Sequence, residues 1–246
     1  MNKLHTKVAL VTGGGHGIGQ AIAERLSQDG IIVIINYAHS QIEAEALARK
    51  LVKQGGKAIS LKADMGNPDD VRAMFVEVDR LFDQLDILIN NAAITKGAPL
   101  ANITEALMDE VFAVNIKGAI TASQEAAKRL GQGGRIVNIS SSTTLFPMVG
   151  SSLYAGSKTI LKLFTEVWAR ELGPRGITVN SVVPGPTSPG SFDHASKEMQ
   201  VQAAAASPFG RIGTAEEIAA AVAFLCSDDA NWVSGQHLLV NGAATI

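Results

Sequence analysis

Tyr154 and Lys158 are two residues of this sequence whose types and spacing could do chemistry together. They stand four positions apart, so on a helix they would share one face, one turn apart. An ammonium group beside a phenol favours the phenolate, and we therefore expect Lys158 to lower the pKa of Tyr154 from its usual value of about 10. A tyrosine tuned in this way exchanges a proton with a substrate near neutral pH. The alternative is a surface tyrosine beside a solvated lysine.

A glycine-rich turn near the start of the chain suggests a second kind of chemistry. The apolar run Lys7–Thr12 is followed by the segment Gly13-Gly14-Gly15-His16-Gly17-Ile18-Gly19 and then by a helical pattern. Glycines permit a tight turn and let a pyrophosphate approach the backbone, while the N–H groups that begin a helix bind phosphate. An ordinary turn between a strand and a helix can have the same glycine-rich sequence. The position of this turn at the first strand-to-helix junction of the chain favours nucleotide binding.

The elements that must position these residues alternate along the chain. Strand-like runs are apolar nearly throughout, which is typical of strands covered by helices on both faces; they lie at Lys7–Thr12, Ile31–Asn36, Ala58–Lys62, Asp86–Ile89, Arg135–Ile139, Ile177–Val182 and His237–Val240. Helical patterns lie at Gly19–Asp29, Gln41–Gln54, Asp69–Leu81, Thr104–Lys128, Tyr154–Leu172 and Ala215–Ser227. This alternation predicts an α/β fold, a doubly wound (Rossmann) parallel sheet of about seven strands with helices on both faces.

We expect residues 1–246 to form one dinucleotide-binding and catalytic domain. The rhythm of strands and helices breaks only at residues 184–208, which open with a proline- and glycine-rich stretch and continue into an alanine-rich one. Proline and glycine forbid regular structure at the start of this segment. We interpret it as a flexible segment that covers the substrate.

Composition and charge exclude several classes of protein. The 246 residues are 46% hydrophobic and 18% charged, with a net charge of −2, which indicates a globular chain without the positive charge that nucleic-acid binding requires. Cys226 is the single cysteine, so no internal disulfide is possible, and the five histidines show no spacing typical of a metal site. The segment Met1–His5 lacks a signal-peptide core and no membrane-spanning stretch follows, so we expect a soluble, cytoplasmic protein with no membrane partner.

Several short motifs, taken in order, resemble those of the short-chain dehydrogenase/reductase family. Besides the glycine turn, they are Asn90-Asn91-Ala92-Ala93, Asn115 in V-N-I-K-G, Ser141 thirteen residues before Tyr154, Tyr154-x-x-x-Lys158, Pro184-Gly185, and Arg211 to Glu217. Alanine stands at Ala93 and Ala215 where the family has glycine and proline. The resemblance runs from about residue 5 to residue 242 and is closest to bacterial 3-oxoacyl-[acyl-carrier-protein] reductases.

This resemblance implies the roles of four catalytic residues. Tyr154 would donate a proton to the substrate oxygen in reduction and remove it in oxidation. Ser141 would hydrogen-bond that oxygen, and Lys158 would also bind the nicotinamide ribose hydroxyls. Asn115 would hold a water that links Lys158 to solvent. The implied reaction is interconversion of a carbonyl and a secondary alcohol by hydride transfer.

The end of the second strand predicts NADP(H) as the cofactor, with NAD(H) as the alternative. A carboxylate there would accept the ribose 2′-hydroxyl of NAD, but Tyr37 stands where NAD-preferring relatives carry aspartate. Ser40 offers a donor to a 2′-phosphate, and His16 stands where many NADP-dependent relatives carry arginine. The full set of expected cofactor contacts is Gly13, Gly15, His16, Gly17, Ile18, Gly19, Tyr37, Ala38, His39, Ser40, Asp64, Met65, Asn91, Ala92, Ala93, Tyr154, Lys158, Pro184, Gly185 and Thr187.

The substrate stays open at this point between a 3-oxoacyl thioester and a small ketone. The reductases that act on acyl carrier protein dock it with two basic residues; Gln132 replaces the first, while Arg175 matches the second, so a carrier-protein partner is in doubt. Phe146, Pro147, Met148, Val149 and Leu153 either line an apolar pocket or pack their loop. The resemblance also implies a homotetramer, in which helices Thr104–Lys128 and Tyr154–Leu172 pair between subunits.

Three other functions remain as alternatives. The same family contains NAD-dependent alcohol, sugar and polyol dehydrogenases. A nucleotide-binding sensor without catalysis would be expected to lack Ser141, Tyr154 or Lys158, and all three are present. A purely structural oligomer would not need the glycine-rich turn.

Overall fold

The protein is built around one seven-stranded sheet. The computed structural model describes residues 6–244; Met1–His5, where we expected no signal-peptide core, lies outside the described residues. The strands follow the order β3-β2-β1-β4-β5-β6-β9, and all neighbours are parallel. Their bounds are β1 Val8–Val11, β2 Ile32–Tyr37, β3 Ala58–Lys62, β4 Leu85–Asn90, β5 Leu130–Ile139, β6 Thr178–Pro184 and β9 His237–Val240. This confirms the predicted doubly wound α/β fold.

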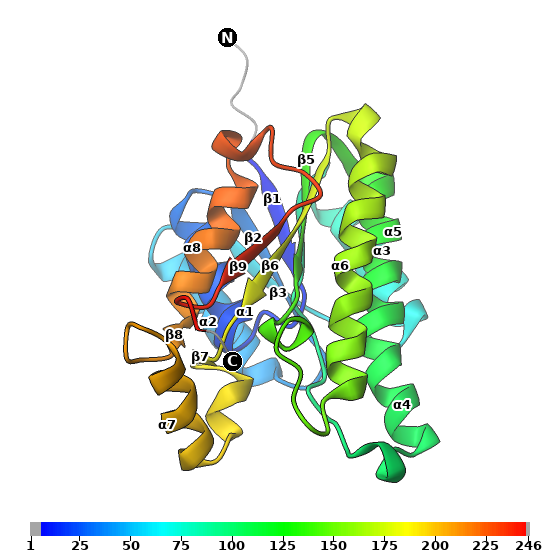
Figure 1. Ribbon diagram of the computed structural model, residues 1–246. Coiled ribbons are helices and arrows are strands. Elements are labelled where there is room, and N and C mark those ends of the chain that lie inside the picture. The colour runs from blue at the N-terminus through cyan, green and yellow to red at the C-terminus, as the bar shows by residue number, and fades with distance from the viewer. Residues whose placement is uncertain (1–5, 245–246) are drawn as a thin grey trace.

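Helices cover both faces of the sheet (Figure 1). One face packs against α1 (Gly17–Gln28), α2 (Gln41–Lys53) and α8 (Ala215–Cys226). The other packs against α3 (Pro68–Leu81), α5 (Ala119–Arg129) and α6 (Ser152–Leu172). Two buried apolar clusters result, one on each side of the strands. Burial on both sides explains why the strand sequences are apolar nearly throughout.

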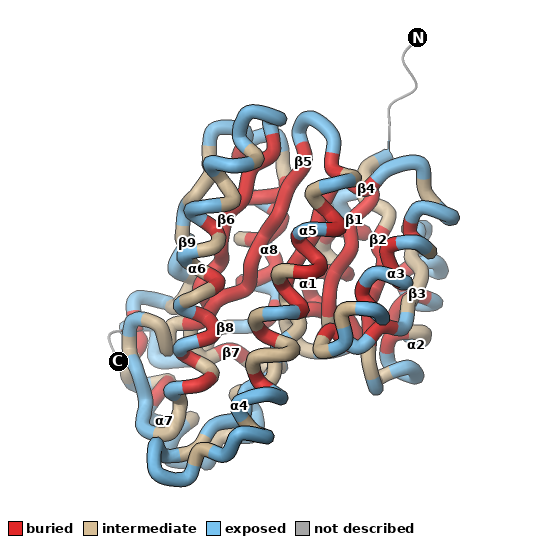
Figure 2. The backbone as a smooth tube through the Cα atoms, turned by 90° about the vertical axis from the view of Figure 1, so that its right-hand side faces the viewer, coloured by how far each residue is buried: buried red, intermediate tan, exposed pale blue. Residues whose placement is uncertain are grey.

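Burial is deepest along the central strands, as the tube in Figure 2 shows. Every residue of β1 and β4 is buried, and so are the last six residues of β5. Burying apolar area at roughly 25 cal/mol per Å² makes this core the main source of stability. The carboxyl ends of these strands are therefore held rigidly. The loops that follow the strands consequently start from fixed positions. No helix of residues 6–244 is both long and apolar enough to span a membrane.

The predicted long helix Thr104–Lys128 is interrupted, which corrects the sequence interpretation. It consists of α4 (Glu105–Phe112), a π-helical turn (Ala113–Gly118) and α5. π-turns inside α-helices are rare and occur often at functional sites. The turn contains the buried residue Asn115, one of the four predicted catalytic residues. A 3.6-residue periodicity does not reveal the inserted residue.

The segment 184–208 leaves the seven-stranded sheet at the end of β6 and continues through short elements. A two-residue strand β7 (Thr187–Ser188) pairs with β8 (Gly213–Thr214), and a 3₁₀ turn (Ser191–His194) leads into α7 (Lys197–Ala206). In Figure 1, α7 lies beside β7 and β8, at the end of the molecule where the parallel strands finish. The helix α7 contains the alanine-rich stretch of this segment, while β7 and β8 are too short to be predicted from sequence.

Candidate active site

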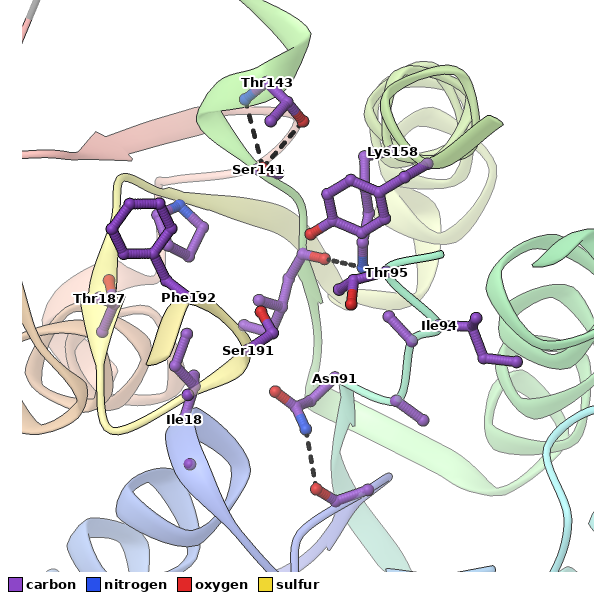
Figure 3. A pocket seen from close by; sticks show the side chains of 18 of the residues that line it. Ile18, Asn91, Ile94, Thr95, Ser141, Thr143, Lys158, Thr187, Ser191 and Phe192 are labelled. Atoms are coloured by element: carbon purple, nitrogen blue, oxygen red, sulfur yellow. Dashed lines mark hydrogen bonds between the residues drawn. The ribbon is translucent and has the colours of Figure 1, made fainter. Parts of the chain in front are cut away.

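A cavity of about 1440 Å³ opens at the carboxyl ends of the parallel strands. In doubly wound sheets this edge, where the strand order reverses, is where ligands bind. The cavity collects every predicted catalytic and cofactor-binding residue except Gly15 and Asn115. Figure 3 shows side chains from the glycine turn, from the loop after β4, from α6 and from the segment after β6 facing one space. The motifs that are far apart in sequence thus meet at one place.

The glycine turn has a shape that other residues would not tolerate. Gly13 and Gly17 have φ angles of +60° and +54°, in the left-handed region that favours glycine. A Cβ atom on Gly13 would lie 3.0 Å from the Cα atom of Ala92, so the loop after β4 approaches the turn closely. A Cβ atom on Gly15 would lie 2.9 Å from Ser40 Oγ and 3.6 Å from the Cβ atom of Ala44, at the start of α2. The missing side chain lets α2 pack against the turn; Gly15 is not among the residues that line the cavity, and its contact with a cofactor stays a prediction.

The N-terminus of α1 is left open toward the cavity. Side chains cap the N-termini of α3, α4, α7 and α8 by accepting a backbone N–H, but His16 makes no such bond to α1, and the first turn of α1 holds no acidic residue. Unsatisfied N–H groups and the positive end of the helix dipole therefore face the cavity. These are the features that bind a phosphate group.

Thr12 and Asn91 join the glycine turn to the loop after β4. The Thr12 hydroxyl accepts the backbone N–H groups of Asn91 and Ala92, at 2.9 and 3.0 Å. The Asn91 amide donates to the backbone oxygens of Thr12 and Gly13, at 2.9 and 3.0 Å. These four hydrogen bonds fix the two loops relative to each other. The Asn91 side chain therefore holds the glycine turn in place.

Ser141, Tyr154 and Lys158 come together beside this turn. Lys158 is fully buried, and its Nζ atom donates to the backbone oxygen of Ile139 at 2.7 Å (Figure 3). Burial lowers the pKa of Lys158 from 10.5 to about 8. Tyr154 and Lys158 share one face of α6, with Nζ 5.9 Å from the centroid of the phenol ring. The predicted juxtaposition of the three side chains is therefore present.

The pKa of Tyr154 differs from the expectation. Burial in the site raises the pKa of Tyr154 above its usual value, and a hydrogen bond with Ser141 offsets only part of this effect. Lys158 does not lower it, because the ammonium is directed toward the carbonyl of Ile139. The predicted lowering of the Tyr154 pKa by Lys158 is therefore wrong. A buried phenol of this kind is protonated at neutral pH and is suited to donate a proton.

Asn115 lies in the π-turn beside the cavity and not in its wall. Its Oδ1 atom accepts the N–H of Ile94 at 2.8 Å, and its Nδ2 atom donates to the Ile94 oxygen at 2.9 Å and to Ser157 Oγ at 3.0 Å. Both donors of the amide are used in these bonds. Asn115 thus ties the loop after β4 to α6, and any water that it holds must bind its remaining Oδ1 lone pair or its backbone.

The end of β2 supplies the part of the cavity expected to discriminate between cofactors. Tyr37, Ala38, His39 and Ser40 all line it. Asp64 and Glu110 are the only carboxylates among the described lining residues. Asp64 accepts the N–H of Gly66 at 2.8 Å, and Glu110 pairs with Lys96 at 2.7 Å. No acid therefore comes from the end of β2 itself.

Asn36 is a contributor that the sequence reading missed. It lines the cavity, accepts the N–H of Gly13 at 3.1 Å and donates to the oxygen of Ala63 at 3.0 Å. It holds the glycine turn against β2 and β3. Its polar side chain at the end of an otherwise apolar strand could have indicated this role in the sequence.

The outer wall of the cavity carries several large apolar side chains among polar ones. The loop between Ser141 and Tyr154 and the segment leading to α7 contribute the apolar side chains; these are Leu145, Phe146, Pro147, Met148, Phe192 and Met199. Ser191, His194 and Gln202 of the second segment line the cavity as well. Val149 points to solvent with 97% of its surface exposed, and Leu153 is buried outside the cavity. Of the five loop residues considered, Phe146, Pro147 and Met148 thus line the pocket. Phe192 and Met199 were not identified from sequence, because proximity across the cavity depends on the return of the chain through β7.

Arg175, the second expected docking residue for an acyl carrier protein, is engaged elsewhere. Its guanidinium donates to the backbone oxygens of Ala127 and Leu130, at the end of α5. It follows the C-terminus of α6, a 21-residue helix about 30 Å long, whereas Tyr154 lies in the first turn. Within one chain, Arg175 is therefore remote from the cavity.

Comparison with known proteins identifies the family. A family model described as enoyl-(acyl carrier protein) reductase matches residues 13–245. An uncharacterized oxidoreductase of Methylorubrum extorquens is 41% identical, with 98% of this chain and 99% of the relative covered. Versicolorin reductase 1 of Aspergillus parasiticus is 38% identical, with 99% and 98% covered. A crystal structure of a short-chain dehydrogenase from Burkholderia cenocepacia in complex with NADP has a TM-score of 0.93 and 41% identity, with 99% of both chains covered. The protein is thus an oxidoreductase that belongs to the short-chain dehydrogenase/reductase family.

Proposed function

We propose that this protein is an NADP(H)-dependent reductase that interconverts a carbonyl group and a secondary alcohol. The observation that carries the proposal is the meeting of Ser141, Tyr154 and Lys158 at the wall of a cavity that also contains the open N-terminus of α1. The cofactor would supply a hydride to the carbonyl carbon. The chain itself must bind the substrate oxygen and deliver a proton to it.

Tyr154 is the proton donor in this scheme. Its raised pKa keeps the phenol protonated, so the proton is available when negative charge develops on the substrate oxygen. Ser141 donates a second hydrogen bond to that oxygen. Lys158 is buried one helical turn away, where its ammonium can bind the ribose hydroxyls of the cofactor. Asn115 would hold the water that resupplies the proton.

The glycine turn and the start of α2 support NADP(H). Gly13 and Gly17 leave room for the backbone to approach a pyrophosphate, and the uncapped N–H groups of α1 face it. Ser40 is the N-cap residue of α2 but accepts no helix N–H with its side chain. Its hydroxyl is thus free for the 2′-phosphate that distinguishes NADP from NAD. The NADP-bound neighbour from Burkholderia cenocepacia supports the same choice.

The large apolar side chains of the outer wall favour a hydrophobic carbonyl substrate. Phe146, Met148, Phe192 and Met199 offer aromatic and thioether surfaces, which contact flat or branched apolar groups well. Gln132 stands in place of the first basic docking residue, and Arg175 is remote from the cavity of its own chain. We therefore propose a free ketone over a carrier-bound thioester. The name of the relative versicolorin reductase 1 supports a reductase activity.

We further propose that the chain acts as one domain within a cytoplasmic homotetramer. Residues 184–208 form one wall of the cavity through Thr187, Phe192 and Met199 and would move to admit the substrate. The helices expected to pair between subunits, α4, α5 and α6, lie together on one side of the molecule (Figure 1).

Oxidation of NADPH across a panel of carbonyl compounds tests the proposal. The panel comprises aromatic ketones, aliphatic ketones, a 3-oxoacyl thioester and a 2-enoyl thioester, with polyols and NADP⁺ tested in the reverse direction. We expect turnover with apolar ketones and a loss of at least tenfold in the Ser141→Ala variant. Turnover confined to the enoyl thioester, or NADPH binding without turnover of any compound, would contradict it.

A further inference from the structure

The side chain of Ser141 receives two hydrogen bonds from one neighbour. The backbone N–H of Thr143 donates to Ser141 Oγ at 3.2 Å, and the hydroxyl of Thr143 donates to the same atom at 2.9 Å. Figure 3 shows both bonds converging on Ser141 at the cavity wall. Thr143 itself lines the cavity. The Ser141 hydroxyl is therefore bound from its outer side by a residue of its own turn.

These two bonds determine what Ser141 can do. A serine hydroxyl has one O–H donor and two lone pairs that accept. The backbone N–H of Thr143 occupies one lone pair of Ser141 Oγ. When the Thr143 hydroxyl donates to the other lone pair, Ser141 retains only its O–H group. In this arrangement Ser141 donates a hydrogen bond and does not accept one from Tyr154.

We propose that Thr143 is a positioning residue that fixes Ser141 as a hydrogen-bond donor to the substrate oxygen. The chain of donors then runs from Thr143 through Ser141 to that oxygen. Tyr154, which has no acceptor in Ser141, directs its own O–H to the same oxygen. This inference rests on the proposed function, since it assigns an orientation to two of its catalytic residues.

The surroundings of Ser141 strengthen the effect of this arrangement. Ser141 is buried at the cavity wall, where successive hydrogen bonds polarise one another. A hydroxyl that accepts from Thr143 consequently donates more strongly to the developing negative charge. The benefit is greatest in the transition state, so it should be seen in kcat.

The same turn provides a matched control. Thr144 also donates its hydroxyl to Ser141, but to the backbone oxygen, at 2.8 Å. Both threonines belong to the 3₁₀ turn Ser142–Thr144 and are half-buried. Thr144 is not part of the cavity wall. Replacing it with valine therefore perturbs the turn without touching Ser141 Oγ.

The experiment is a double-mutant cycle on the most active ketone of the panel. We expect Thr143→Val to lower kcat by about 3- to 10-fold, the effect of one lost hydrogen bond, with the KM for NADPH unchanged. Thr143→Ser should restore wild-type kcat, and Thr144→Val should stay within twofold of wild type. In a Ser141→Ala background, Thr143→Val should cause no further loss, because Thr143 acts through Ser141.

The outcomes separate this inference from the proposed function. An active wild type with an impaired Ser141→Ala variant, but full activity in Thr143→Val, overturns the role of Thr143 alone. Equal losses from Thr143→Val in the presence and absence of Ser141 also overturn it, since they indicate a merely structural effect. If Thr143→Val does not fold, Thr143→Ala replaces it in the cycle with the same expected losses. A wild type inactive on every carbonyl overturns the proposed function and with it this inference.

Discussion

The Nζ atom of Lys158 lies 5.9 Å from the centroid of the Tyr154 ring, yet its hydrogen bond goes to the carbonyl of Ile139. The two side chains share one helix face, but each is affected mainly by burial, which raises the pKa of the phenol and lowers that of the amine. Both shifts favour the neutral forms. Tyr154 is therefore ready to give a proton, while Lys158 holds its charge at a cost in stability.

The buried amine gives a prediction about stability and pH. The pKa of Lys158 is about 8 in the folded chain and near 10.5 otherwise, so between these values the unfolded state binds more protons and wild-type stability rises with pH. Lys158→Met lacks the titrating amine, so its free energy of unfolding does not share this rise. We therefore expect the free energy of unfolding of Lys158→Met, minus that of wild type, to fall by on the order of 1–3 kcal/mol between pH 7 and pH 10.

Urea unfolding of the protein without cofactor, at several pH values, measures this difference. Lys162→Met is the control, because Lys162 lies one turn farther along α6 at a position that is only half-buried. Its stability difference from wild type should change little over the same range. A Lys158→Met difference that is constant with pH would contradict the assignment of a buried, destabilised ammonium.

The cofactor preference is tested at Tyr37. Tyr37→Asp places a negative charge at the end of β2, near the expected 2′-phosphate. Repulsion in a partly desolvated site should shift the preference toward NADH by on the order of a few kcal/mol. The measurement is the ratio of kcat/KM for NADPH over NADH, with Tyr37→Phe as the uncharged control that keeps the wild-type ratio.

The histidines of the site add a pH trend to the same ratio. His16 and His39 line the cavity, and histidine is the side-chain type that serves most often as a switch near physiological pH. If a positive charge on either side chain contributes to binding of the 2′-phosphate, the wild-type preference for NADPH should weaken between pH 6 and pH 8.5. A preference for NADH at every pH shows that the interpretation of the end of β2 is wrong. A constant preference for NADPH shows that neutral donors such as Ser40 suffice.

The start of α8 gives a prediction about folding. The Thr214 hydroxyl accepts the N–H of Glu217, and the Glu217 carboxylate accepts the N–H of Thr214 and pairs with Arg211. Thr214→Ala should lower the free energy of unfolding by about 1–2 kcal/mol. Thr104→Ala, at an N-cap without the returning bond, should cost less. Urea unfolding compares the two, and an equal or smaller loss for Thr214→Ala would argue against the reciprocal cap.

Assembly is tested on the exposed side of α6. Leu163 and Val167 are 58% and 42% exposed, beside the stacked rings of Phe164 and Trp168. Val167→Glu should dissociate the proposed tetramer by placing a charge in an apolar contact. Light scattering at micromolar concentration should find wild type well above the 25.7 kDa of one chain. Val52→Glu, on the opposite face of the sheet, is the control; a monomeric wild type would refute the assembly.

The fold was predictable because its signals are local and repeated. Strands buried on both sides must be apolar throughout, and the sequence shows this directly. The interruption at Ala113–Gly118 depends instead on the bonds between Asn115 and Ile94, which join segments distant along the chain. Likewise, β7 and β8 exist only because each pairs with the other.

The catalytic residues of the site were predictable from the sequence, whereas the residues of its outer wall were not. Ser141, Tyr154 and Lys158 follow from motif spacing, and they meet in the structure. The direction of the Tyr154 pKa shift was missed, because a four-residue spacing says nothing about burial. Phe192 and Met199 reach the cavity from a segment whose path depends on tertiary contacts. No sequence pattern therefore predicts that these two residues line the cavity.

The most direct measurement of the central claim is the rate of hydride transfer in Tyr154→Phe under single-turnover conditions. The substitution removes the transferable proton and almost no volume, so NADPH should bind as in wild type by fluorescence titration. Loss of a general acid is expected to slow the step by about 10²- to 10⁴-fold. Normal NADPH affinity with such a loss is the predicted result. A Tyr154→Phe enzyme within twofold of the wild-type rate would contradict the assignment of Tyr154 as the proton donor.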